Sequence, residues 1–394
     1  MTREHHHPNG YFAPEACDID EFRTIIDQTT LERTVPNACD VQSKVPLYDM
    51  RDLRDPLEDP TRRRQIMAEW AKVLREGAGI VVLKGAYQET QVIDEATSAY
   101  EAIIKTEKDG NAGAGDHFAA SGANDRIWNS LEKLCDRAPE VFLRYFANTP
   151  IAAVCEAWLG PNYQMTAQVN LVHPGGAAQL AHRDYHLGFQ TADISAAYPA
   201  HVHDLSPVLT LQGAVAHCNM PVESGPTKLL PFSQTYRPGY TAWRRDDFRA
   251  LFEERQIQLP LSKGDALFFN PATFHAAGAN TSADIHRMAN LLQVSSAFGR
   301  TMETIDRTQM CKALYPHALK ARQSGALNRS ELAAAIAATA EGYSFPTNLD
   351  RDPPVGGLAP ETQQAYFLRA LSENVGVAEF GAQLDLMDVK RLSC

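Results

Sequence analysis

The residues best suited to do chemistry in this chain are His182, Asp184, His275 and Arg287. His182 and Asp184 stand two residues apart, so on an extended strand both side chains point to the same face. With His275 they would offer two imidazoles and one carboxylate to one side of a metal ion. This donor set suits non-haem Fe(II) and leaves coordination positions open for a co-substrate and O2. The pattern therefore predicts an iron site at which O2 reacts.

Arg287 follows His275 by about the length of one turn and the start of the next strand. A guanidinium placed there would face the same cavity and bind a carboxylate through two parallel hydrogen bonds. Residues 263–271 read as a turn, a buried strand and a stop, residues 273–280 as a short strand and a turn, and residues 287–298 as a second apolar strand. We therefore expect His275 and Arg287 on neighbouring strands.

One turn carries a resemblance to a known family. Residues 223–234, ESGPTKLLPFSQ, resemble the GPT…PGSH turn of the phytanoyl-CoA dioxygenase superfamily. The H-R-D triplet, this turn, the GDALFF strand, the distal histidine and the arginine occur in the family's order and approximate spacing, over about residues 79–298. The chain departs from the family at Gln234, where a histidine is usual, and beyond residue 305.

The resemblance implies an Fe(II)- and 2-oxoglutarate-dependent dioxygenase. His182, Asp184 and His275 would hold the iron, and Arg287 the distal carboxylate of 2-oxoglutarate. It also implies a mainly β fold with flanking helices (α+β), built on a double-stranded β-helix of the jelly-roll or cupin-like kind.

Asp184 narrows the expected reaction, because related halogenases have a small residue in place of this carboxylate. We therefore expect hydroxylation of an unactivated C–H bond in a small organic molecule, with O2 consumed and succinate and CO2 released. Desaturation, demethylation and ring closure use the same chemistry, and the sequence does not separate them.

Asn170 and Thr227 are the further candidates for binding the co-substrate. Asn170 alternates with apolar residues on the strand that leads towards His182, so its amide would reach the metal-proximal end of 2-oxoglutarate. The alternatives stay open: Asn170 as an amide bonded to a neighbouring loop, and Thr227 as a hydroxyl that closes its own turn.

Two segments supply candidates for the substrate side of the pocket. A loop rich in glycine and alanine, residues 108–124, has the length of a lid and leads into Arg126 and Trp128. The second segment follows the metal ligands directly. The candidates are His117, Phe118, Arg126, Trp128, Tyr185, His186 and Phe189. A surface loop with Trp128 packed on the following helix is the other interpretation of the first segment.

His186 also supports a competing function. It continues the two-residue spacing of His182 and Asp184, so a regular strand would present it as a fourth ligand. A Zn- or Mn-dependent hydrolase or isomerase on a cupin-like barrel would use His182, Asp184, His186 and His275 and would not need Arg287. A non-catalytic protein that kept the barrel is a third hypothesis.

The composition bears on partners and location. The net charge of the 394 residues is −11 without a basic stripe, which argues against nucleic acid and leaves a small-molecule substrate and O2. No apolar run approaches 18 residues and no charged-then-apolar leader opens the chain, so we expect neither a membrane span nor secretion. The seven scattered cysteines without a C-x-x-C favour free thiols in a reducing cytoplasm.

The sequence divides into three parts. Residues 1–57 are expected to form an N-terminal arm, residues 58–304 the double-stranded β-helix domain with its N-terminal helices, and residues 305–394 a helical C-terminal extension. Helices are predicted from Asp59-Pro60 onwards and over 309–323, 330–341 and 360–373. We expect this extension to pack on the core or to form a contact in a homo-oligomer.

Overall fold

The computed structural model describes residues 10–110, 124–354 and 356–393. Its strands are β1 (Asp40–Gln42), β2 (Val45–Asp49), β3 (Ile80–Lys84), β4 (Asn124–Ile127), β5 (Gln164–Val172), β6 (Thr210–Ala216), β7 (Lys228–Leu229), β8 (Ile257–Gln258), β9 (Ala266–Phe269), β10 (His275–Ala276) and β11 (Arg287–Ser295). They form an eight-stranded sheet in the order β1-β2-β3-β9-β6-β11-β5-β4 and a three-stranded sheet in the order β10-β7-β8. Only β2 and β3 pair in parallel, so the large sheet is mixed.

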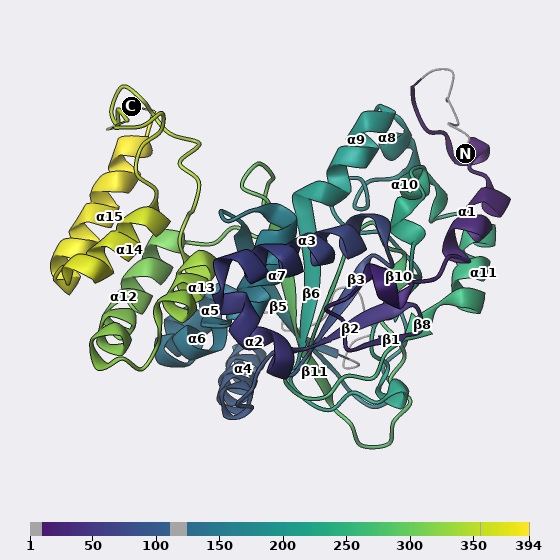
Figure 1. The fold of residues 1–394 in the computed structure, drawn as a ribbon, viewed down its shortest axis with the longest axis horizontal. Helices are drawn as coiled ribbons and strands as arrows, with labels where there is room; N and C mark the ends of the chain where they lie inside the picture. Colours follow the sequence, from purple (N-terminus) through teal and green to yellow (C-terminus); the bar gives the residue numbers. More distant parts are fainter. Residues whose placement is uncertain (1–9, 111–123, 355, 394) are drawn as a thin grey trace.

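The helices outside the sheets occupy most of the remaining chain (Figure 1). They are α1 (Ile19–Ile26), α2 (Met50–Glu58), α3 (Pro60–Glu76), α4 (Gln91–Asp109), α5 (Ser130–Arg137), α6 (Pro139–Phe146), α7 (Thr149–Leu159), α8 (Ala192–Ala196), α9 (Ala200–Leu205), α10 (Gly239–Ala242), α11 (Asp246–Arg255), α12 (Arg307–Ser324), α13 (Arg329–Thr339), α14 (Gln363–Glu373) and α15 (Val377–Arg391). No helix in the described ranges is both long and apolar enough to cross a membrane.

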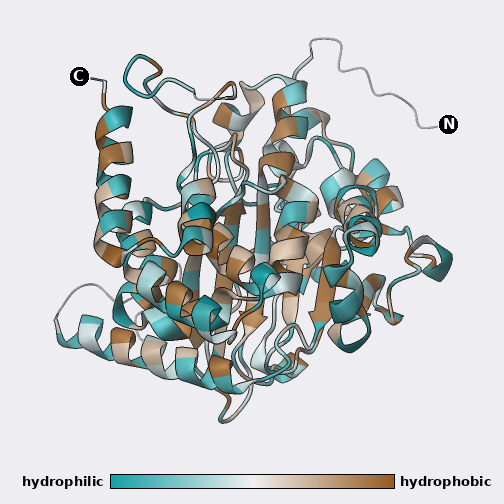
Figure 2. Cartoon of the chain, turned by 60° about the vertical axis from the view of Figure 1, so that its left-hand side comes forward, coloured by the Kyte–Doolittle hydropathy of each residue, from teal (hydrophilic) through white to brown (hydrophobic). Residues whose placement is uncertain are grey.

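Apolar side chains on the two faces of the large sheet belong to two different cores. On β3, Val81 and Leu83 join the core beneath the helices, while Ile80 and Val82 join the core that the small sheet also lines. This division follows from the two-residue period of a strand. In Figure 2 the strands carry brown, hydrophobic segments interrupted by paler and teal ones. The large sheet is therefore the middle layer, with a helical layer packed on one face and the small sheet packed on the other.

The small sheet is extended by the segment that carries the H-R-D triplet. His182 lies in an isolated antiparallel bridge to His275, with each backbone N–H donating to the other's carbonyl at 3.0 and 3.1 Å. The triplet was expected on a regular strand, but the described residues on either side of His182 form no ladder. The bridge nevertheless holds His182 directly opposite His275.

Helix α3 begins where the sequence predicts. The Asp59 carboxylate accepts hydrogen bonds from the backbone N–H groups of Thr61 and Arg62, and Pro60 occupies the first turn. The predicted stripe, which includes Ile66 and Trp70, is buried against the large sheet and its neighbours.

The C-terminal helices pack on the rest of the chain. Helix α12 contacts α5 and α6, and α13 contacts α6, α7 and β5, so the tail shares one apolar core with the helical layer. The three predicted helices are present as α12, α13 and α14 with somewhat different bounds. A fourth helix, α15, was not predicted, although its buried residues Phe380, Leu384 and Met387 have helical spacing. In Figure 1, α12, α14 and α15 lie at one end of the molecule, and α1 and α11 at the other.

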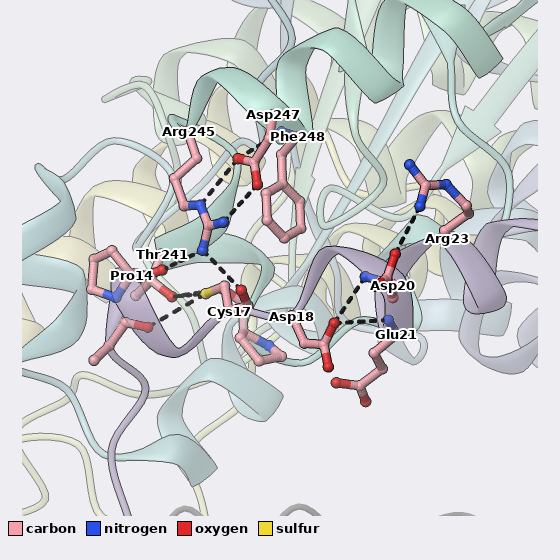
Figure 3. A network of polar contacts seen from close by, with 12 residues as sticks. Pro14, Cys17, Asp18, Asp20, Glu21, Arg23, Thr241, Arg245, Asp247 and Phe248 are labelled. Atoms are coloured by element: carbon pink, nitrogen blue, oxygen red, sulfur yellow. Dashed lines mark hydrogen bonds and ion pairs between the residues drawn. The ribbon is translucent and has the colours of Figure 1, made fainter.

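The N-terminal segment is more regular than an arm. Strand β2 pairs with β3 and so joins the large sheet, while α1 packs against α11. Figure 3 shows how Arg245 fastens this segment: its guanidinium donates to the carbonyls of Pro14 and Cys17 at 2.9 and 2.8 Å and pairs with Asp247 at 2.6 Å.

The expectation of a β-sheet core with flanking helices agrees with this architecture, but the expectation of a mainly β protein does not. Helices contain more residues than strands, and the structure is mixed α/β. The helices of the tail and of the layer beneath the sheet account for the difference.

Candidate functional site

His182, Asp184 and His275 converge on one point. One ligand atom from each lies within 4.8 Å of the others. The Asp184 carboxylate stands between the two rings, with its Oδ1 atom 3.6 Å from His182 Nε2 and its Oδ2 atom 3.3 Å from His275 Nε2. Two nitrogen donors and one oxygen donor at this separation fit a metal bound on one face.

The backbone selects the ring nitrogen that each histidine offers. His182 Nδ1 lies 2.8 Å from the Leu180 carbonyl, and His275 Nδ1 lies 2.8 Å from the Thr273 carbonyl. A carbonyl only accepts, so each Nδ1 carries the proton and each Nε2 keeps its lone pair. Both lone pairs are on the side of Asp184, which is the arrangement that metal-binding histidines require.

The protonation states at the site also suit a metal. Burial lowers the pKa of His182, so its imidazole is neutral at neutral pH. Burial alone would raise the pKa of Asp184, but the imidazoles of His182 and His275 outweigh it and hold that pKa below its ordinary value. A neutral imidazole and an ionised carboxylate bind a cation without first losing a proton.

Gln212 on β6 positions Asp184. Its Nε2 donates to Asp184 Oδ2 at 2.6 Å, while its own Oε1 is buried without a hydrogen-bond partner in the described residues. Gln212 pairs in register with Gln293 of β11, whose Oε1 accepts the Tyr185 hydroxyl at 2.5 Å. Gln212 was not among the residues predicted from the sequence. The sequence feature that could have indicated it is a single amide within the apolar strand 210–216.

Arg183, between the two ligands, points away from them. It is 1% exposed and donates to the carbonyls of Ser233 and Tyr236 at 2.6 and 2.9 Å. Its guanidinium also lies over the rings of Tyr240 and Phe274. This anchor fixes the extended segment, and alternation then places His182 and Asp184 on the cavity side.

A cavity of about 650 Å³ opens beside the three ligands. Arg287 and the mainly apolar side chains of Met220, Leu259, Leu261 and Phe269 line part of it. Arg287 is 7% exposed, and in the described part of the chain its guanidinium has no hydrogen bond or carboxylate partner. Burial lowers its pKa to about 10, so it remains charged at neutral pH. A buried cation without a counter-charge is costly unless a ligand anion pairs with it.

The relation between His275 and Arg287 differs from the expectation. His275 is on β10 of the small sheet and Arg287 is on β11 of the large sheet, so they are not on neighbouring strands. Both line the cavity, which therefore draws its walls from the two sheets.

Asn170 and Thr227 both line this cavity. Asn170 Oδ1 is buried without a hydrogen-bond partner, and the Thr227 hydroxyl makes no side-chain hydrogen bond, in both cases among the residues that the structure describes. Neither side chain is therefore committed to the local bond that was its alternative interpretation.

Some of the predicted substrate-binding residues line the cavity and others do not. Arg126 and Phe189 line the cavity, and Trp128 lies beneath Arg126, 5.2 Å from its guanidinium carbon, without lining the cavity. Tyr185 does not line it either; its hydroxyl donates to Gln293, which does line the cavity. His117 and Phe118 lie outside the described residues.

His186 does not join the metal ligands. The backbone leaves the extended conformation at Tyr185 (φ 62°) and His186 (φ 39°), so the two-residue alternation ends at Asp184. The His186 ring instead lies 3.2 Å from the Ser206 hydroxyl. The hydrolase hypothesis therefore lacks its fourth ligand.

Comparison with known proteins places this site in a family. The family model for phytanoyl-CoA dioxygenase (PhyH) matches residues 75–289, more than half of the chain. The chain belongs to the phytanoyl-CoA dioxygenase family. The matched range contains His182, Asp184, His275 and Arg287, so the candidate metal ligands and the candidate co-substrate arginine lie within the part that the family model covers.

Individual relatives are distant. Dioxygenase andF of Emericella variicolor is 26% identical over 142 residues, which are 34% of this chain and 43% of that protein. The match thus spans less than half the length of this curated relative.

Among solved structures, the chain is similar to the α-ketoglutarate-dependent epimerase SnoN of nogalamycin biosynthesis (21% identity, 61% of this chain and 84% of that chain, TM-score 0.39). It is also similar to the carbocyclase SnoK (22%, 58% and 83%, TM-score 0.41) and to EvdMO1 (16%, 59% and 50%, TM-score 0.42).

Proposed function

We propose that this chain is a non-haem Fe(II)- and 2-oxoglutarate-dependent oxygenase, and that it hydroxylates an unactivated C–H bond of a small organic molecule. The overall reaction converts R–H, O2 and 2-oxoglutarate into R–OH, succinate and CO2, so one oxygen atom enters the product and the other enters succinate. The observation that carries the proposal is that one cavity holds both a two-histidine, one-carboxylate cluster and a buried arginine that has no acidic partner among the described residues.

In this proposal His182, Asp184 and His275 are the iron ligands. The bound iron would supply the activation of O2 that the protein's own side chains cannot provide. Gln212 would keep the Asp184 carboxylate in place, and the two backbone carbonyls would keep both Nε2 atoms directed at the metal.

Arg287 would bind the distal carboxylate of 2-oxoglutarate. Its guanidinium is charged and has no partner in residues 10–110, 124–354 and 356–393, which supports this role because a carboxylate would supply both the counter-charge and the hydrogen-bond acceptors. Asn170 and Thr227 would donate to the same co-substrate, and the apolar side chains of Leu259, Leu261 and Phe269 would keep water from it.

We also propose that the two sheets are the halves of a double-stranded β-helix. Three features support this: the small sheet and the large sheet share one apolar core, His182 bridges to His275, and the cavity has walls from both sheets.

The first test of the co-substrate role is anaerobic reconstitution with Fe(II), followed by a spectral titration with 2-oxoglutarate. A weak visible charge-transfer band should appear only when both are present. Arg287→Ala should weaken 2-oxoglutarate binding by about 10- to 100-fold, since it removes a charge-assisted hydrogen-bond pair, and should leave Fe(II) binding intact. Arg255→Ala is the matched control, because Arg255 is an exposed arginine at the end of α11.

Absence of the band, together with tight zinc binding that 2-oxoglutarate does not change, would contradict the co-substrate role. Hydroxylation is tested separately by a substrate screen for succinate release under isotopically labelled O2. One labelled oxygen in the product supports hydroxylation, whereas a stimulating substrate that gives an unlabelled product would contradict it.

A further inference from the structure

A second group of cationic side chains lies beside the metal ligands. Trp243 and Arg249 line the cavity, and the Trp243 ring lies 6.5 Å from the His182 ring. The guanidinium carbons of Arg244 and Arg249 lie 3.8 and 5.7 Å from the centre of the Trp243 ring. Two positive charges thus share one indole at the wall of the cavity.

Three N–H groups of this cluster have no acceptor among the described residues. They are Arg249 Nε, Arg244 Nη1 and Trp243 Nε1, and all three atoms are buried. Arg244 uses its other terminal nitrogen on the carbonyls of Gly188, at 3.2 Å, and Gln190. Buried donors without acceptors are rare and costly, so their occurrence together calls for an acceptor from outside the chain.

The charges point to the same conclusion. Burial lowers the pKa of Arg244, and the positive charge of Arg249 lowers it further, but no carboxylate in the described ranges pairs with either residue. The next residue in the chain is a useful contrast: Arg245 is paired with Asp247 and with backbone carbonyls (Figure 3). The chain has a net charge of −11. Two neighbouring arginines without a carboxylate partner among the described residues are therefore a local exception.

An oxyanion would supply both missing features, namely acceptors for the N–H groups and negative charge for the guanidinium groups. The distal carboxylate of 2-oxoglutarate is already assigned to Arg287, which lies on β11 and not on the segment 243–249. With the distal carboxylate of 2-oxoglutarate at Arg287, an anion at Arg249 would come from another molecule in the same cavity.

We propose that Arg249, with Trp243 and Arg244 beside it, binds an oxyanionic group of the substrate. This inference rests on the proposed function, because it takes Arg287 as the co-substrate site. The substrate class is a small organic molecule that carries a carboxylate or a phosphate away from the C–H bond that reacts. The planar guanidinium would bind the anion through two hydrogen bonds, and the face of Trp243 would lie along the adjoining part of the substrate.

The test uses three probes that share one ring and differ in charge: 4-fluorobenzoate, 4-fluorophenyl phosphate and the neutral 4-fluorobenzamide. Fluorine NMR would measure their dissociation constants with the Zn(II)-loaded protein saturated with 2-oxoglutarate, so that Arg287 is occupied. We expect one of the anions to bind about 10-fold more tightly than the amide, the size of one charge-assisted contact. The tighter anion identifies the group as carboxylate or phosphate.

Arg249→Gln should reduce this preference to about 2-fold or less, while Arg255→Gln on the same helix should leave it unchanged. Arg249→Lys retains the charge but not the paired hydrogen bonds and should give an intermediate preference. Equal affinities for anions and amide in the wild type, or an unchanged preference in a folded Arg249→Gln protein, would overturn the proposal.

The same samples separate this proposal from the assignment of Arg287. Arg249→Gln should leave 2-oxoglutarate affinity within about 2-fold of the wild type, whereas Arg287→Ala should weaken it. If neither variant changes 2-oxoglutarate binding, the co-substrate assignment fails, while the Arg249-dependent preference for anions stands on its own measurement. If Arg249→Gln weakens 2-oxoglutarate binding as strongly as Arg287→Ala, the substrate subsite is wrong.

Discussion

At the scale of single residues, each of the three proposed metal ligands has a hydrogen-bond partner that limits its rotation. His182 and His275 each donate a hydrogen bond from Nδ1 to a backbone carbonyl, and Asp184 accepts a hydrogen bond from Gln212. Such partners orient ligands before a metal binds, so they affect affinity without touching the metal.

The first residue-scale prediction concerns Gln212. Gln212→Leu removes the hydrogen bond to Asp184 Oδ2 and leaves the carboxylate free to rotate. We expect Fe(II) affinity to fall by about 10- to 100-fold, the usual effect of losing such a partner, with little change in fold. Competition titration with a metal-sensitive chelator measures this. Gln323→Leu on the exposed side of α12 is the control, and equal metal affinity in the two variants would show that Gln212 does not position Asp184.

At the scale of elements, a polar network joins the large sheet to the helices behind it. His217 follows β6 and lies 2.8 Å from the Thr97 hydroxyl of α4 and 2.8 Å from the Tyr145 hydroxyl of α6. Asn290 of β11 donates to the same Tyr145 hydroxyl at 3.2 Å. Burial lowers the pKa of His217 to about 3, so the folded protein holds this imidazole neutral.

This network predicts a dependence of stability on pH. The unfolded chain protonates His217 near its ordinary pKa of about 6.5, whereas the folded protein resists protonation down to about pH 3. The unfolded state therefore binds more protons between these values, and stability should fall as the pH drops from about 6.5 towards 3. Above pH 6.5 the contribution is fully present.

The measurement is the free energy of unfolding in urea at several pH values between 8 and 4. His217→Gln should lower stability at pH 8, because it disturbs a buried network, but should make the decline towards acid pH shallower than in the wild type. His201→Gln is the control for a histidine outside this network, since His201 is exposed at the start of α9. Equal slopes in wild type and His217→Gln would assign the acid sensitivity to other groups.

At the scale of the whole molecule, the C-terminal helices share the core of the oxygenase part. Phe380 of α15 is fully buried, stacks on Tyr315 of α12 at 3.7 Å between ring centres, and packs on Tyr366 of α14. Since α12 and α13 in turn contact α5, α6 and α7, we expect the tail and the rest of the chain to unfold together.

Phe380→Ala tests this expectation. Removing a buried aromatic ring should lower the free energy of unfolding by about 3–5 kcal/mol, and the loss should appear as a lower midpoint of one transition. Leu386→Ala on the same helix is the matched control, because Leu386 is 46% exposed and should change stability by less than about 0.5 kcal/mol. A separate early transition in Phe380→Ala would show that the tail is an independent unit.

Self-association through the C-terminal helices stays a prediction. Exposed apolar side chains on α15, such as Leu386 and Val389, are compatible with it. Analytical ultracentrifugation of the wild type and of Leu386→Glu would decide the question; a monomer at all concentrations would contradict the contact.

The sequence by itself predicted the three side chains that the structure brings together as a candidate metal site, and it predicted several of the helical segments. His182, Asp184, His275 and Arg287 were identifiable because their types define a donor set and their order along the chain survives in a family pattern. Helix α3 was predictable because Asp59, Pro60 and a regular apolar stripe are local signals.

Only the tertiary structure decided which other side chains reach the site. His186 does not face the candidate metal site, because Tyr185 and His186 have positive φ and end the alternation of side chains between two faces. The sequence pattern does not reveal this change of backbone conformation. Gln212 and Arg249 were missed because they lie on a strand and a helix that are 28 and 65 residues beyond Asp184 (212 − 184 and 249 − 184). Only the folded chain brings Gln212 to Asp184 and Arg249 to the same cavity. Local spacing defines what one segment can present, whereas long-range packing determines which segments face each other.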